Sequence, residues 1–233
     1  MSELRTLKSE IRKVATPGRA RINKWFFKTA PGEYGEGDRF LGVTVPQLRV
    51  LARTHQNLAL RDAERLLQSP WHEERLLALL ILVRQHARGD VRVRHAIHRL
   101  YLRNTRRINN WDLVDSSAPQ IVGAHLIDSH RSLLRKLAQS SSLWERRIAM
   151  IATQHFIRNG SFGDALTIAG LLVHDDHDLI HKAVGWMLRE IGNRHRASEE
   201  RFLRKYAHVM PRTMLRYAIE KFPHTLRRRY LAR

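Results

Sequence analysis

Asn109-Asn110-Trp111-Asp112-Leu113-Val114-Asp115 is the stretch from which the fold of this 233-residue chain can be read. An asparagine side chain accepts a hydrogen bond from an otherwise unpaired N–H of a first helical turn, so Asn109 or Asn110 is expected to cap a helix. On that helix Trp111 and Asp115 are four residues apart and project from the same face. Taken alone, the pair also fits a tryptophan packed between helices and an aspartate paired with a neighbouring arginine.

Helical spacing of apolar residues extends along almost the whole chain. Two helices are predicted at 4–16 and 20–28, separated by Pro17-Gly18. The glycine-rich segment 30–38 is expected to be a surface turn, because its three acidic residues would repel a phosphate. No segment alternates with the period of a strand, so an all-α fold is predicted. The further predicted helices are 45–54, 60–68, 71–87, 90–103, 110–121, 129–138, 143–158, 162–173, 176–192, 198–206 and 211–221.

The helices recur in pairs whose second members carry a polar residue close to a small one. These polar positions are 40, 32, 35 and 34 residues apart, and they are Arg75, Asp115, Arg147, Lys182 and Arg216. Such a period is typical of stacked helical hairpins, in which each repeat buries its apolar face against its neighbours. We therefore predict a superhelical solenoid of antiparallel helix pairs, whose second helices line one concave face. A solenoid favours a single domain over 1–233, with N-terminal helices and the glycine-rich loop in 1–40 and a basic tail in 223–233.

Charge points to a polyanionic partner. The chain has 42 Lys and Arg side chains against 22 Asp and Glu, a formal net charge of +20. A surplus of this size favours salt-dependent binding to nucleic acid. Arginine is more frequent than lysine, which suits bidentate phosphate contacts. A codon bias would explain that ratio, although it would not explain the net charge.

Composition also excludes several classes of protein. The chain contains no cysteine, which excludes disulfides, a thiolate nucleophile and cysteine-ligated metals. No apolar run approaches the roughly 20 residues that span a bilayer, and the N-terminus lacks the apolar segment of a secretory signal. A cytoplasmic protein associated with the nucleoid is expected.

Placing the repeats in register brings the opening stretch together with residues of the next two second helices. Trp111 and Asp115 then share one wall with Arg147 and with Trp186, which is four residues after Lys182. Gly185, which precedes Trp186, is small enough for a close approach of two backbones. Packed core tryptophans and inter-repeat ion pairs remain the alternative interpretation of these residues.

Three motifs in this order resemble those of the AlkD-type DNA alkylation repair glycosylases, which are built from HEAT-like repeats. They are Trp-Asp-x-Val-Asp at 111–115, Trp-x-x-Arg-x-Ala at 144–149 and Lys-Ala-x-Gly-Trp-x-Leu-Arg-Glu at 182–190. Phe40-Leu41-Gly42-Val43 and Phe27-Lys28-Thr29, together with the glycine-rich loop, resemble the N-terminal segment of that family. The resemblance extends from about residue 20 to about residue 222.

This resemblance implies base excision repair of alkylated DNA, by hydrolysis of the N-glycosidic bond of N3- and N7-alkylated purines in double-stranded DNA. It matches Asp115 to the catalytic carboxylate, Trp111 and Trp186 to an aromatic pair at the lesion, and Arg147 to an arginine near the phosphate or the carboxylate. The family commonly has a tyrosine where this chain has Phe26, so a hydrogen bond from that position is lost. The residues expected to contact DNA are Phe26, Lys28, Arg146, Lys182 and Arg216.

The residue types suit this chemistry. An alkylated purine is cationic and departs as a neutral base, so the site mainly needs negative charge beside the sugar and a means of orienting water. Asp115 can supply both, and the indole faces of Trp111 and Trp186 attract positive charge. No cofactor and no metal are required, and the protein is expected to act as a monomer.

Two other functions remain open at this stage. A metal-dependent hydrolase would use the segment His174-Asp175-Asp176-His177-Asp178 with His181, although acids before a helix more often cap it. A non-catalytic basic module that binds DNA, RNA or an acidic protein is the stronger alternative. A carboxylate such as Asp115 on a DNA-facing surface argues against that alternative, because it weakens binding unless it takes part in chemistry or pairs with Arg147.

Overall fold

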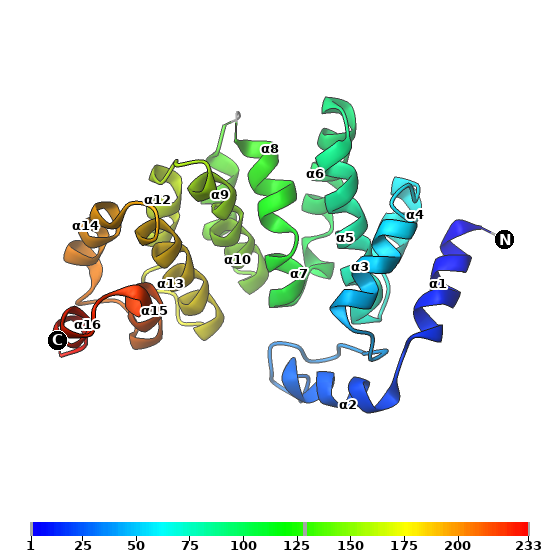
Figure 1. Cartoon of the computed structure of the whole chain (residues 1–233), viewed down its shortest axis with the longest axis horizontal. Helices are drawn as coiled ribbons and strands as arrows, with labels where there is room; N and C mark the ends of the chain where they lie inside the picture. The colour runs from blue at the N-terminus through cyan, green and yellow to red at the C-terminus, as the bar shows by residue number, and fades with distance from the viewer. Residues whose placement is uncertain (1, 128–129, 233) are drawn as a thin grey trace. The chain divides into compact units, whose positions relative to one another are not determined.

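The computed structural model describes residues 2–127 and 130–232 of the chain. All regular structure in these residues is helical apart from one isolated β-bridge between Arg39 and Trp71. The helices form two compact units, Met1–Ile121 and Val122–Arg233 (Figure 1). The prediction of an all-α fold is confirmed.

The N-terminal unit is centred on one long helix, α5 (His72–Arg88), against which α3, α4 and α6 pack. Short connections between consecutive helices fold them back as pairs, which buries the apolar stripe of each helix against its neighbour. Leu77, Leu79 and Leu82 of α5 are fully buried in this core. The other helices of the unit are α1 (Glu3–Lys13), α2 (Pro17–Phe26), α3 (Val45–Thr54), α4 (Leu60–Leu67), α6 (Val91–Arg103) and α7 (Trp111–Asp115).

The start of α3 shows why the sequence begins a helix where it does. Thr44 and Gln47 form a capping box, in which each side chain bonds the backbone N–H of the other residue. Pro46 lies in the first turn, where its missing N–H costs no helical hydrogen bond. The predicted helix 45–54 therefore has the observed bounds of α3.

The C-terminal unit is organised around α13 (Asp178–Gly192), which packs against α10, α14 and α15. A Cβ placed on Gly185 would lie 2.5 Å from the carbonyl oxygen of Met214 and from Cβ of Tyr217. This confirms the predicted close backbone approach at Gly185, and its partner is α15. The other helices of the unit are α8 (Ala124–Leu126), α9 (Ser132–Ala138), α10 (Leu143–Ala152), α11 (Gln154–Arg158), α12 (Gly163–Leu171), α14 (Arg196–Tyr206), α15 (Arg212–Ala218) and α16 (His224–Leu231).

Several predicted elements differ from the structure. The helix predicted over 110–121 is regular only in α7, and the turn after it leads into a π-helical segment, Pro119–Gly123, because a proline inside a helix removes a hydrogen bond. The helix predicted over 143–158 divides into α10 and α11 at Thr153, whose hydroxyl bonds the carbonyl oxygen of Met150. Pro17 and Gly18, predicted to separate the first two helices, instead form the start of α2. Residues His224–Leu231 of the predicted basic tail form α16.

Candidate active site

Helix α7 carries both residues of the opening pair. Asn110 is its N-cap, and the side-chain oxygen accepts a hydrogen bond from the backbone N–H of Trp111 at 2.9 Å. Of the two predicted capping asparagines, Asn110 is the one used. Trp111 is the first residue of the helix and Asp115 the last, and both side chains are partly exposed.

Trp111 lies in an aromatic cluster formed with the end of α2. Its ring is stacked on Phe27, with the ring centres 5.4 Å apart, and Phe26 contacts it edge-on at 5.8 Å. Phe26 itself is 51% exposed. The predicted DNA contact Phe26 therefore lies beside the predicted catalytic Trp111.

Asp115 lies beside a buried tyrosine of α6. The ring of Tyr101 is fully buried, and its hydroxyl is 3.1 Å from the hydroxyl of Ser117. Burial raises the pKa of Tyr101 above its ordinary value, and the negative charge of Asp115 raises it further. Tyr101 is therefore a neutral phenol that interacts electrostatically with the Asp115 carboxylate.

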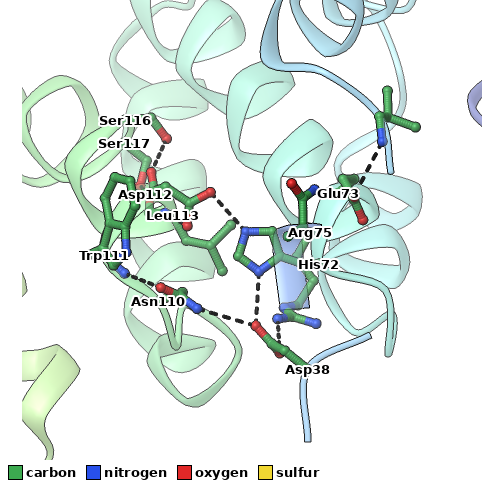
Figure 2. A network of polar contacts seen from close by, with 12 residues as sticks. Asp38, His72, Glu73, Arg75, Asn110, Trp111, Asp112, Leu113, Ser116 and Ser117 are labelled. Carbon is green, nitrogen blue, oxygen red and sulfur yellow. Dashed lines mark hydrogen bonds and ion pairs between the residues drawn. The ribbon is translucent and has the colours of Figure 1, made fainter. Parts of the chain in front are cut away.

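A polar network in the N-terminal unit, centred on His72, was not predicted from the sequence. His72, at the start of α5, contacts Oδ2 of Asp38 through Nδ1 at 2.9 Å and Oδ2 of Asp112 through Nε2 at 2.8 Å (Figure 2). The guanidinium of Arg75 donates to Oδ1 of Asp38 at 2.6 Å. His72, Arg75 and Asp38 are each less than a tenth exposed. Asp112 follows Trp111 directly, so the network reaches the proposed lesion-binding tryptophan.

These contacts fix the charges of the cluster. Burial alone would lower the pKa of His72, but the charge of Asp112 and hydrogen bonds to both aspartates raise it to about 9. Burial opposes ionisation of Asp38, yet the hydrogen bond from His72 and the charge of Arg75 bring its pKa below the ordinary value. The ring of His72 is accordingly an imidazolium at neutral pH, and Asp38 is a carboxylate.

A pocket of about 500 Å³ opens beside this network in the N-terminal unit. Its wall includes Phe26, Phe27 and Trp111 on the aromatic side and His72 and Asp112 on the polar side. Apolar walls with a few charged groups are typical of ligand sites. The pocket thus joins the aromatic cluster to the polar network.

Lys28, another predicted DNA contact, follows the aromatic pair of α2. Its φ of +53° places it in the left-handed region, and its ammonium lies over the ring of Trp25 at 5.5 Å. Lys28 is exposed, and Trp25 is 75% exposed. The surface around α2 therefore combines positive charge with aromatic faces, as single-stranded or distorted nucleic acid favours.

The remaining predicted catalytic residues belong to the C-terminal unit. Trp186 lies on α13 and is partly exposed. Arg147 lies on α10, is 5% exposed and donates from Nη1 to the carbonyl oxygen of Leu179 at 2.5 Å. One donor of Arg147 thus satisfies a carbonyl in the first turn of α13, and its predicted contact with a phosphate or with Asp115 stays a prediction.

The predicted phosphate contacts of this unit differ in what they already bind. Arg146 forms a salt bridge with Asp175 at 2.6 Å and also donates to the carbonyl oxygens of Ser140 and Ser141. Lys182 pairs with Asp178 one turn earlier on α13, at 2.7 Å. Arg216 on α15 is exposed. Binding DNA through Arg146 would require exchange of an existing salt bridge, whereas Arg216 has an exposed guanidinium.

The acidic segment before α13 has a structural role. Asp175 pairs with Arg146 and accepts the backbone N–H of His177, while the His177 ring caps α13 at Leu179. Within residues 2–127 and 130–232, no group of three or more His, Asp or Glu side chains is arranged to hold a metal ion. In the same residues, no helix is both long and apolar enough to cross a membrane.

Sequence reasoning missed His72, Asp38 and Asp112 because their burial is a tertiary property. His72 belongs to a polar run, His72-Glu73-Glu74-Arg75, that opens an otherwise apolar helix and would ordinarily be assigned to a solvated helix end. All four of these side chains are buried. The concentration of four charged or polar residues before a long apolar run was the available signal.

Comparison with known proteins identifies the family and the fold. The family model described as DNA alkylation repair enzyme matches residues 7–222. A solved structure described as a predicted DNA alkylation repair enzyme from Enterococcus faecalis is similar in fold, with a TM-score of 0.70 at 15% identity, covering 90% of this chain and 97% of the other. None of the curated proteins matches the sequence. Because the family match extends over most of the chain, one conclusion follows: the chain belongs to the DNA alkylation repair enzyme family.

Proposed function

We propose that this protein is a DNA glycosylase that hydrolyses the N-glycosidic bond of cationic N3- and N7-alkylated purines in double-stranded DNA. The observation that carries the proposal is the placement of Trp111 and Asp115 at the two ends of α7, in a chain of this family. Trp111 also lines the aromatic-walled pocket. The enzyme would act in base excision repair, as a monomer in the cytoplasm, without a cofactor.

Hydrolysis of this bond requires few catalytic groups from the protein. Water adds to C1′ of the sugar, and the base departs with the bonding electron pair, which neutralises its positive charge. The proton released by the water passes to Asp115 or to solvent. Asp115 would stabilise the oxocarbenium-like transition state and orient the water, and the face of Trp111 would favour the cationic nucleotide.

The C-terminal unit would contribute to binding of the same duplex. Trp186 offers a partly exposed aromatic face, and Arg216 an exposed guanidinium for a phosphate. Arg147, Arg146 and Lys182 are proposed to contact the DNA backbone near the lesion, with the last two exchanging their present acidic partners for phosphate. The net charge of +20 supports a polyanionic partner.

Release of methylated purines from methylated duplex DNA tests the proposal, with the unmodified protein compared with Asp115→Asn. Release that falls at least about tenfold in the variant, or ~1.4 kcal/mol of barrier, would place the carboxylate in the chemistry. Release that Asp115→Asn leaves unchanged would retain the glycosylase and reject this mechanism. Salt-sensitive DNA binding without any release would identify the alternative, a non-catalytic basic HEAT-like module.

A further inference from the structure

The ring of His72 packs against two phenylalanine rings and contacts two aspartate side chains. Its centre is 4.8 Å from that of Phe27 and 4.7 Å from that of Phe40, and the latter pair is stacked. Both ring nitrogens point at aspartate oxygens, at 2.9 and 2.8 Å (Figure 2). A carboxylate can only accept, so each nitrogen must donate, and a ring that donates from both nitrogens carries a positive charge.

The contact with Asp112 connects the His72 ring to the start of α7. Oδ2 of Asp112 binds the His72 ring, while Oδ1 accepts the backbone N–H of Leu113 at 2.9 Å. The carbonyl of Asp112 accepts the hydroxyl of Ser116 at 2.7 Å. Asp112 is therefore held at both its side chain and its backbone, and it lies between Trp111 and the rest of the helix.

The same ring fixes two other segments of the N-terminal unit. Asp38, at the end of the glycine-rich loop, binds His72 and Arg75, and Asn110 approaches its Oδ2 at 3.5 Å. Phe27, whose ring is tilted against that of His72, stacks on Trp111 at 5.4 Å. A loop, the end of α2, the start of α5 and the start of α7 thus meet at one imidazole.

The cluster is electrically balanced. Asp38 and Asp112 each carry one negative charge, and His72 and Arg75 each carry one positive charge, so the four groups sum to zero. Glu73 is saturated separately, because its carboxylate accepts the backbone N–H groups of three residues, Leu41, Gly42 and Val43. The paired charges of these four groups fix the geometry of the segments that carry them.

We propose that His72 is a positioning residue for base excision: as an imidazolium clamped between Asp38 and Asp112, it holds α7 so that Trp111 and Asp115 are presented correctly. The catalytic part of this inference rests on the proposed glycosylase function. The charge of the ring and the anchoring of α7 do not depend on that function, and both can be measured without DNA.

The charge state is measured first, by nitrogen NMR of the histidine side chains in the full chain. His72→Gln assigns the signals, and the exposed His208 provides a reference in the same spectrum. At a pH of about 7.5, where an ordinary imidazole is mostly neutral, both nitrogens of His72 are expected to show bound protons. A neutral ring with a single N–H at that pH would overturn the proposal.

The kinetic test uses Asp112→Asn, which keeps the size of the side chain and removes the charge that faces His72. Single-turnover release of methylated purine is expected to slow at least tenfold, while Kd for the methylated duplex changes less than about threefold, since positioning affects the transition state more than binding. Asp176→Asn is the matched control, because it makes the same change in net charge at an exposed position in the other unit. Unchanged release by Asp112→Asn would overturn the positioning role.

Amide hydrogen exchange separates this inference from the proposed function. His72→Gln is expected to speed exchange in α7 while exchange in α10 stays as in the unmodified protein. If the unmodified protein released no purine, the glycosylase proposal would fail, and exchange would still decide whether His72 anchors α7. Unchanged exchange in α7 would reject the anchor, whether or not the protein is a glycosylase.

Discussion

Glu199 packs against Gly192 so closely that a Cβ on residue 192 would overlap its carboxylate. Glu199 is 1% exposed, and its Oε1 has no hydrogen-bond partner among the described residues. Burial raises the pKa of Glu199 to about 8, although the nearby Arg196 opposes this shift. The C-terminal unit therefore contains a carboxylic acid that is largely protonated at neutral pH.

Glu199→Gln is expected to stabilise the protein at pH 8 and to have little effect at low pH. The folded state binds this proton more tightly than the unfolded state, so the contribution of Glu199 to the free energy of unfolding falls as the pH rises from about 4.5 to about 8. The glutamine is of similar size and cannot ionise. Thermal unfolding across this range checks the prediction, and parallel pH profiles of the two proteins would contradict it.

The His72 cluster is expected to lose its contribution to stability at alkaline pH. Because the pKa of His72 is raised from 6.5 to about 9, its contribution is complete below pH 6.5 and is lost as the pH rises through about 9. Asp38→Asn, which removes one buried partner of His72 and Arg75, is expected to destabilise the protein by about 3 kcal/mol at neutral pH. Urea unfolding should show this penalty shrinking above pH 9, and a penalty independent of pH would argue against an imidazolium.

Gly185→Ala is expected to separate α13 from α15 and to cost about 1–3 kcal/mol, because the added methyl group would meet backbone atoms rather than a flexible side-chain end. Gly163→Ala is the matched control. A Cβ at Gly163 would meet nothing within 4 Å, and alanine is the better helix former, so no loss of stability is expected there. Equal melting temperatures for the two variants would show that the backbone contact at Gly185 is not tight.

Arg216→Ala is expected to weaken DNA binding uniformly across sequences and to reduce the slope of log affinity against log salt concentration by about 0.9, the value for one phosphate contact. Arg92→Ala removes the same charge from an exposed position on α6 that is not predicted to contact DNA. Titrations of duplex DNA at several salt concentrations measure both slopes. A similar loss in both variants would indicate a general effect of charge and no contact at Arg216.

Local interactions explain why much of the fold could be predicted. Helices α3 to α6 begin and end close to the predicted residues, because apolar spacing, a capping box and turn signals are properties of neighbouring residues. Asn110 caps α7, and Gly185 allows a close backbone approach, both as expected. Pro119 and Thr153 modify helices that the apolar pattern alone would continue.

The polar network could not be predicted in this way. Asp38 and Asp112 are 34 and 40 residues from His72 in the sequence, and only packing brings their carboxylates to the two ring nitrogens. The salt bridge of Arg146 could not be predicted either. The sequence suggests that Arg146 contacts a phosphate, whereas in the structure it pairs with Asp175.

Composition and local spacing suffice to predict an all-α chain of repeated helix pairs with a strongly basic charge, and three motifs carry the resemblance to a family of DNA repair enzymes. Which polar groups are buried, and with which partners they pair, depends on tertiary packing. Burial removes water from His72, Glu199 and Arg147. The protonation state and the hydrogen bonds of such a group then depend on the side chains and backbone groups that the fold places beside it.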